Sequence, residues 1–276
     1  MKNKIIGIIL LLLVLAGCYK FDSDEKPKGE NQTKKELKGR DIYLNSGSAK
    51  NESGDYRGAI ETYNEGIKLN FYIKETYNFR GIAKTNLGDY KGAMKDYSEA
   101  IAIDPNYRDP YHNRGNIKII LGDYKGAIKD LDKAIKLDPN YKEAYYDRGI
   151  AKLMSGDLQG VIVDCDKVIE LDPNYVDGYY FRGLVKEMLE DYSGAMKDYV
   201  KVVELDPNYV DGYYGRGLVK AELGDYKEAI KDYDKALELD PDYLDIYNDR
   251  GRAKEKIGDY EGATKDYDEM IKRQEF

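Results

Sequence analysis

A pentapeptide close to Leu-Asp-Pro-Asn-Tyr recurs in this chain every 34 residues, and this spacing constrains the fold more than any other feature. Its first copy starts at Ile103 and its last at Leu239. A second motif, Gly-Asp-Tyr or a close variant, keeps the same interval from Gly54 to Gly258. Constant spacing without insertions indicates stacked copies of one supersecondary unit, each of which buries its apolar face against its neighbours. Seven repeats therefore fill the chain after residue 39, with the boundaries 40-73, 74-107, 108-141, 142-175, 176-209, 210-243 and 244-276.

Each repeat is predicted to fold as two antiparallel helices. Positions are numbered within a repeat, so that position 1 is Arg40 in the first repeat and Lys74 in the second. Positions 4, 8 and 11 share one face of a first helix because of the 3.6-residue period. Glycine at position 15 ends that helix, and aspartate at position 16 caps the second helix. Proline at position 32 then prevents the second helix from continuing.

This pattern resembles the tetratricopeptide repeat, whose consensus places Trp, Leu-Gly, Tyr, Ala, Phe and Pro at these offsets. Glycine occupies position 8 of every repeat, and alanine occupies position 20 of all but the fourth. Tyrosine replaces the tryptophan at position 4, and arginine replaces the leucine at position 7 from the second repeat onward. The resemblance covers residues 40-276 and implies an all-α fold, a right-handed α-solenoid of seven helix-turn-helix repeats.

The arginines at position 7 are expected to serve the fold. Aspartate recurs at position 23 of the second helix, and position 7 lies one turn from the interior tyrosine at position 4. We therefore expect an ion pair between the two positions, with the arginine stem packed on the tyrosine. The arginines are Arg80, Arg114, Arg148, Arg182, Arg216 and Arg250.

The N-terminus carries the features of an export signal. A short basic segment precedes twelve apolar residues from Ile5 to Ala16, which is too short to span a bilayer. The segment ends in Leu15-Ala16-Gly17-Cys18, which resembles the bacterial lipobox. That resemblance implies cleavage after residue 17, lipidation of Cys18 and an exported, membrane-anchored lipoprotein. It would lie in the outer membrane if the organism has two membranes, and otherwise at the cell surface; an uncleaved anchor is the alternative.

Residues 18-39 are predicted to be a lipidated cysteine followed by a flexible charged tether. Tyr19, Phe21 and Leu37 are the only sizeable apolar residues after the cysteine, which is too few for a packed core. If Cys18 carries lipid, Cys165 has no disulfide partner within the chain. We interpret Cys165 as a small buried hydrophobe, because most other repeats place an interior tyrosine there.

The family resemblance implies that the first helices line a concave groove, with positions 2, 5, 9, 12 and 13 facing it. In the middle repeats these positions offer three tyrosines, an apolar strip and an acidic edge. The sequence therefore predicts a groove for a protein or extended peptide, with a preference for a basic segment. The alternative is that the acids only favour helix N-termini. The candidate contact residues are Tyr146, Tyr180, Tyr214, Ile150, Leu184, Leu218, Glu143, Asp177 and Asp211.

Composition argues against several other functions. The formal charge of -8 and the lack of a basic stripe predict that the chain does not bind nucleic acid. His112 is the only histidine, so a metal site built on several imidazoles is excluded, and no Ser or Cys is placed to be its nucleophile. We therefore predict no enzymatic activity, no catalytic residues, no metal and no cofactor. Two further hypotheses stay open: a small-ligand or glycan receptor that stacks on the three tyrosines, and self-association through the C-terminal repeat.

Overall fold

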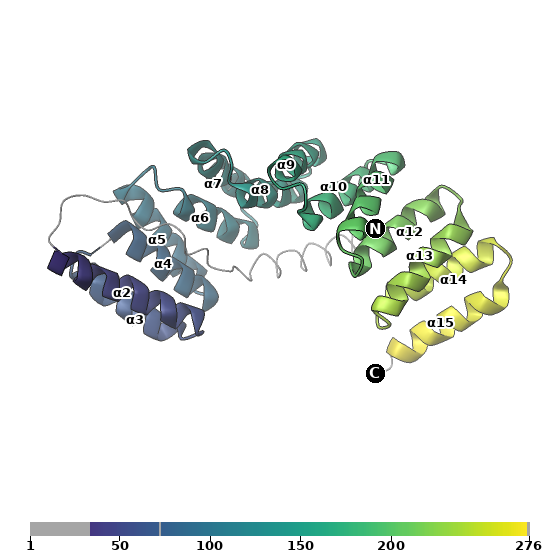
Figure 1. The fold of residues 1–276 in the computed structure, drawn as a ribbon, viewed down its shortest axis with the longest axis horizontal. Coiled ribbons are helices and arrows are strands. Elements are labelled where there is room, and N and C mark those ends of the chain that lie inside the picture. The colour runs from purple at the N-terminus through teal and green to yellow at the C-terminus, as the bar shows by residue number, and fades with distance from the viewer. Residues whose placement is uncertain (1–33, 72, 275–276) are drawn as a thin grey trace. The chain divides into compact units, whose positions relative to one another are not determined.

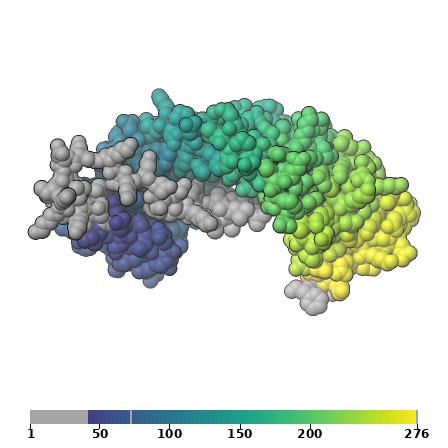
Figure 2. All heavy atoms as spheres, in the orientation of Figure 1, coloured from purple at the N-terminus to yellow at the C-terminus, as the bar shows by residue number. Residues whose placement is uncertain are grey.

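The computed structural model describes residues 34–71 and 73–274, and the side chains from Ile42 onward in these ranges. The described residues form helices without strands, and they divide into two compact units at Ser155 and Gly156. We call these units the N-terminal array and the C-terminal array. Within each array, successive helices run back and forth as antiparallel neighbours and pack closely along their length (Figures 1 and 2). The all-α fold is therefore confirmed.

Each array contains seven helices in the part of the chain that the structure describes. The N-terminal array consists of α2 (Lys34–Glu52), α3 (Tyr56–Lys68), α4 (Ile73–Asn86), α5 (Tyr90–Ile103), α6 (Asp109–Ile120), α7 (Tyr124–Leu137) and α8 (Lys142–Ser155). The C-terminal array consists of α9 (Leu158–Leu171), α10 (Val176–Met188), α11 (Tyr192–Leu205), α12 (Val210–Glu222), α13 (Tyr226–Leu239), α14 (Leu244–Lys256) and α15 (Tyr260–Gln274).

The N-terminal boundary of the repeats differs from the sequence prediction. Helix α2 begins at Lys34, so residues 34–39 are helical and do not belong to a flexible tether. The predicted signal peptide and Cys18 lie outside the described residues. Among the helices that the structure describes, none combines the length and apolarity that crossing a membrane requires.

The turn between the two helices of a repeat needs a left-handed residue at position 15. Six glycines there have φ between 77° and 87°, and the turn after α10 places Glu190 at φ 61°. A residue with a β-carbon pays a steric penalty in this region, whereas glycine does not.

Replacing Glu190 by glycine should therefore stabilise the C-terminal array. We expect Glu190→Gly to raise its free energy of unfolding by about 1 kcal/mol, because the exposed glutamate side chain has no packing to lose. Urea unfolding followed by circular dichroism would measure the change. An unchanged midpoint would contradict the strain assigned to this turn.

Glycine at position 19 has a role that the sequence prediction missed. The cap aspartate of six second helices accepts a hydrogen bond from the backbone N–H of this glycine, at 2.9 to 3.0 Å. On five of these six glycines, Gly58, Gly92, Gly126, Gly194 and Gly262, a β-carbon would lie only 2.1 to 2.2 Å from the aspartate Oδ2. Helix α13 has Glu228 at position 19, and the side chain of its cap residue Asp225 makes no cap bond. The absence of a β-carbon on this glycine thus leaves space for the side chain of the cap aspartate.

The core of each repeat is a large side chain at position 24 lying on the glycine at position 8. In the C-terminal array Tyr199 and Tyr233 are fully buried against Gly183 and Gly217. The fourth repeat instead buries Cys165 between Val161 and Val168. This burial confirms the predicted role of Cys165 as a small core residue, and it raises the pKa of the thiol.

Candidate partner-binding surface

The arginine at position 7 is held inside the fold, as predicted. In five repeats its Nε and Nη2 atoms donate to both carboxylate oxygens of the aspartate at position 23. A lysine at position 11 approaches the same carboxylate at 2.7 to 2.9 Å. The guanidinium carbon also lies 5.1 to 5.9 Å from the centre of the tyrosine ring at position 4. These arginines therefore stabilise the repeat and do not form a ligand-binding row.

Two of the three acids at position 2 of the first helices in the C-terminal array are part of the framework. The Tyr209 hydroxyl donates to Asp177 at 3.0 Å, and the Tyr243 hydroxyl donates to Asp211 at the same distance. Both aspartates also lie in the first turn of their helix, where a negative charge is favoured. Tyr209 and Tyr243, which each end a pentapeptide, thus fasten their repeats to the first helix of the same repeat.

The tyrosines at position 5 are buried. Tyr146, Tyr180 and Tyr214 are only 8%, 5% and 6% exposed, so none offers an open ring face. Within the C-terminal array the Tyr214 ring centre lies 5.3 Å from that of Tyr243 and 6.1 Å from that of Tyr233. Its hydroxyl donates to Asp249 of the next repeat at 2.6 Å. The exposure that stacking on a sugar or a cation requires is absent in this conformation.

The other predicted contact residues divide by exposure. Ile150 and Leu184 are buried, whereas Leu218, Asp177 and Asp211 are partly exposed. Glu143 is exposed, but it belongs to the N-terminal array together with Tyr146 and Ile150. The C-terminal array therefore brings together Tyr180, Tyr214, Leu184, Leu218, Asp177 and Asp211 on α10 and α12.

Family models of the tetratricopeptide repeat match residues 41–72, 81–119, 115–156, 188–224, 210–243 and 232–265. Together these matches cover more than half of the chain. The chain belongs to the tetratricopeptide repeat family. No curated protein matches it.

Several solved structures share the fold. The chain is similar to MamA, with 28% identity and a TM-score of 0.56 over 58% of this chain and 94% of that one. It is also similar to YrrB, which is described as a tetratricopeptide repeat protein with an unusual peptide-binding site (24% identity, TM-score 0.56, 64% and 92% covered). A tetratricopeptide repeat protein from Parabacteroides merdae ATCC 43184 matches with 18% identity and a TM-score of 0.64, over 86% and 93% of the two chains.

Charge is distributed unevenly between the two tetratricopeptide arrays. Residues 34–155 contain 22 basic and 18 acidic side chains, a net charge of +4. Residues 156–276 contain 17 basic and 30 acidic side chains, a net charge of -13. The total of -8 conceals this difference, which was readable from the sequence but was not used in the prediction. The first helices of the C-terminal array carry exposed acids, among them Glu222, Asp245 and Glu255.

Several carboxylates of this array act on the same two tyrosines: Asp177 and Asp211 on Tyr209, and Asp211, Asp240 and Asp245 on Tyr243. Burial raises the pKa of Asp211, although the Tyr243 hydroxyl donates to it. Burial and the neighbouring carboxylates also raise the pKa of Tyr209 and Tyr243. A cation brought close to these carboxylates would favour their charged form.

His112, the only histidine of the sequence, is buried inside the N-terminal array. It is fully buried, with Nε2 2.7 Å from Asp147 Oδ2 and Nδ1 2.7 Å from the Tyr141 hydroxyl. The equivalent position in the preceding repeat, Asn78, accepts a hydrogen bond from Asn113 at 3.0 Å. Position 5 thus bonds to position 6 of the next repeat wherever both are polar. We assign His112 to this inter-repeat contact.

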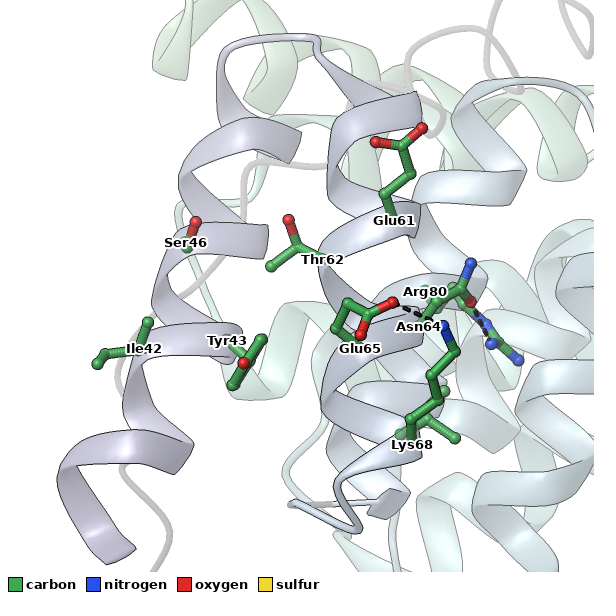
Figure 3. A pocket seen from close by; sticks show the side chains of 10 residues that line it. Ile42, Tyr43, Ser46, Glu61, Thr62, Asn64, Glu65, Lys68 and Arg80 are labelled. Carbon is green, nitrogen blue, oxygen red and sulfur yellow. Dashed lines mark hydrogen bonds and ion pairs between the residues drawn. The ribbon is translucent and has the colours of Figure 1, made fainter. Parts of the chain in front are cut away.

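An open cavity of about 740 Å³ lies in the N-terminal array between α2 and α3 (Figure 3). It occurs where the first repeat has Ser46 at position 7 and Thr62 at position 23, in place of the arginine and aspartate of later repeats. The Tyr43 ring forms one wall, and Glu65 pairs with Lys68 at the rim, 2.7 Å apart. Acidic and basic groups are mixed there, so the cavity favours neither charge. In the described residues, no cluster of His, Cys, Asp and Glu could hold a metal ion.

Proposed function

We propose that this protein is an interaction scaffold whose C-terminal array binds a basic segment of a partner protein. The observation that carries the proposal is the net charge of -13 on residues 156–276, with exposed acids on the first helices of that array. Charge complementarity steers association and selects the partner, and arginine or lysine in the bound segment would pair with these carboxylates.

The buried tyrosines enter this proposal as supports for the surface. Tyr209 and Tyr243 hold Asp177 and Asp211 by hydrogen bonds, so these carboxylates are fixed before a ligand arrives. Fixed groups lose less side-chain entropy on binding than free ones. The partly exposed Leu218 would add an apolar contact beside the acids.

We propose further that the scaffold is exported and held at a membrane through lipidated Cys18. The support is the sequence alone: a basic start, a 12-residue apolar segment and a lipobox-like Leu-Ala-Gly-Cys. Three acyl chains at Cys18 would make this attachment effectively permanent. The C-terminal array would then bind its partner close to a membrane, as the assembly of an envelope complex requires.

Titration with defined peptides tests the acidic surface. We expect a 12-residue lysine-serine peptide to bind the full chain, and a glutamate-serine peptide of equal length not to bind, in calorimetry at low salt. The triple variant Glu222→Gln, Asp245→Asn and Glu255→Gln should weaken binding of the lysine peptide by about fivefold or more, since each lost pair contributes a few tenths of a kcal/mol.

A matched variant controls for overall charge. Glu204, Glu238 and Asp268 are exposed on the second helices of the same array, and replacing them by their amides removes the same three charges. This variant should bind the lysine peptide almost as the natural chain does. Equal weakening in both variants would place the peptide on a different surface.

A further inference from the structure

The outer face of the N-terminal array carries a row of exposed lysines. Helix α5 presents Lys91 and Lys95 four residues apart, so both lie on one face. Helix α7 presents Lys125 and Lys129 at the equivalent positions one repeat later, and Lys136 two turns further on. We call these five residues the lysine ridge.

The lysine ridge has no carboxylate partners within the described residues. The remaining lysine of α7, Lys133, lies 5.8 Å from the Tyr111 ring centre. The same two helices carry four acids. Asp96 and Asp130 are buried and paired with the arginine and lysine of their own repeat, Asp132 is paired with Arg148 at 2.6 Å, and Glu99 is exposed. The cap residues Asp89 and Asp123 bind backbone N–H groups at the helix starts.

At positions 26 and 29 of the second helices, three repeats of the C-terminal array pair a lysine with a glutamate. Lys167 pairs with Glu170 at 2.6 Å, and Lys201 pairs with Glu204 at 3.5 Å. The next repeat continues the series with Lys235 and Glu238, at 3.0 Å. In the third repeat the equivalent pair is Lys133 and Lys136, so the glutamate is replaced by a second cation. At the ridge positions 18 and 22 the C-terminal array pairs Lys231 with Glu228 and Lys265 with Glu261, and it leaves Lys197 and Lys227 without an ion pair among the described residues. The N-terminal array therefore differs by carrying five exposed lysines of this kind on two adjacent repeats, in a part of the chain with a net charge of +4.

We propose that the lysine ridge docks the N-terminal array on an anionic lipid surface. Lysine is depleted from protein–protein interfaces because it is strongly hydrated and flexible, whereas both properties suit a fluid array of phosphates. Each lysine close to an anionic bilayer contributes about 1 kcal/mol of attraction. Five lysines on adjacent repeats thus form an extended electrostatic contact that needs no pocket.

The position of the ridge in the chain agrees with this partner. The inference rests in part on the proposed anchor, because Cys18 precedes the first described residue by about 16 residues, a span of at most about 55 Å. A lipid-anchored chain would therefore hold the basic array within reach of lipid headgroups. The acidic array, with its charge of -13, would be repelled by the same surface and would stay available for a partner.

Vesicle sedimentation of the full chain tests the proposal. The vesicles are phosphatidylcholine alone, or phosphatidylcholine with about 30% phosphatidylglycerol, at low salt and at about 0.5 M salt. We expect phosphatidylglycerol to raise the partition coefficient by about tenfold or more at low salt, and high salt to remove this increment. The ridge variant Lys91→Gln, Lys95→Gln, Lys125→Gln and Lys129→Gln should lose most of the increment.

A control variant removes the same charge from the other array. Lys197, Lys201, Lys227 and Lys231 lie on α11 and α13, and their glutamine variants should keep the phosphatidylglycerol increment. An equal increment in both variants, or no increment in the natural chain, would overturn the proposal. The proposal would also be overturned if the ridge variant changed only in self-association, because the lysine ridge would then bind a second copy of this chain. Binding to phosphatidylcholine alone reports the N-terminal segment, so failure of the anchor and failure of the ridge are distinguishable.

Discussion

Replacing Asp232 by alanine should destabilise the C-terminal array by about 3 kcal/mol. Asp232 is buried and accepts hydrogen bonds from Arg216 at 2.6 and 2.9 Å, while Lys220 approaches at 2.8 Å. Removing the carboxylate leaves two cations facing each other without a counter-charge, and breaking such a buried pair typically costs 3 to 5 kcal/mol. We place the effect at the lower end because both cations retain access to water.

Asp234 on the same helix supplies the control. Its side chain is 55% exposed and pairs with Arg250 at 2.7 Å, so Asp234→Ala should cost less than about 1 kcal/mol. Urea unfolding with a probe in the C-terminal array would compare the two variants. A similar loss of stability in both variants would mean that the ion pair of Asp232 contributes no more than an exposed surface pair. That result would contradict the structural role assigned to the arginines at position 7.

What the sequence predicted well are contacts inside a single repeat. The arginine at position 7 and the aspartate at position 23 are 16 residues apart in every repeat, so one periodic pattern reveals both partners. The turn at position 15 was equally predictable, because this position requires a positive φ. Glycine adopts a positive φ freely, whereas Glu190 adopts it at a steric cost. Each such contact recurs with the repeat and can be recognised by its recurrence.

Contacts between repeats were harder to predict. Burial of Tyr180 and Tyr214 depends on how closely successive first helices approach, and no spacing in the sequence states that distance. The sequence did hold one signal: polar residues at position 6, such as Asp147 and Asp249, stand 35 residues after the position-5 side chains to which they bond. The offset of 35 breaks the 34-residue period, so a search within the repeat does not reveal it.

Isolated departures from the repeat were the other source of error. The cavity beside Tyr43 follows from Ser46 and Thr62, which are small where later repeats have arginine and aspartate. The missing cap bond of α13 follows from Glu228 in place of glycine. Both substitutions are visible in the sequence, but their consequence depends on a packing environment that only the folded repeat defines.

Replacing Gly217 by alanine should destabilise the C-terminal array by about 2 kcal/mol. A β-carbon there would lie 2.6 Å from Tyr233 Cε1 and 2.8 Å from its Cδ1, well inside normal contact. The Tyr233 ring is fully buried against Tyr214 and cannot move aside freely. Overpacking of this kind typically costs 1 to 3 kcal/mol, and it must exceed the gain of about 1 kcal/mol that alanine brings to a helix.

The sign of the change separates packing from helix propensity. If space were available, Gly217→Ala would stabilise α12, so a rise in the unfolding midpoint would refute the assigned contact. A double-mutant cycle with Tyr233→Leu locates the cause, because the third repeat already combines Gly115 with Leu131, whose nearest atom lies 3.0 Å from the added carbon. The cost of the alanine should fall by about half in the leucine background, since a branched aliphatic chain can change rotamer where the ring cannot. An unchanged cost would mean that the helix backbones, and not the ring, set the distance at which these helices pack.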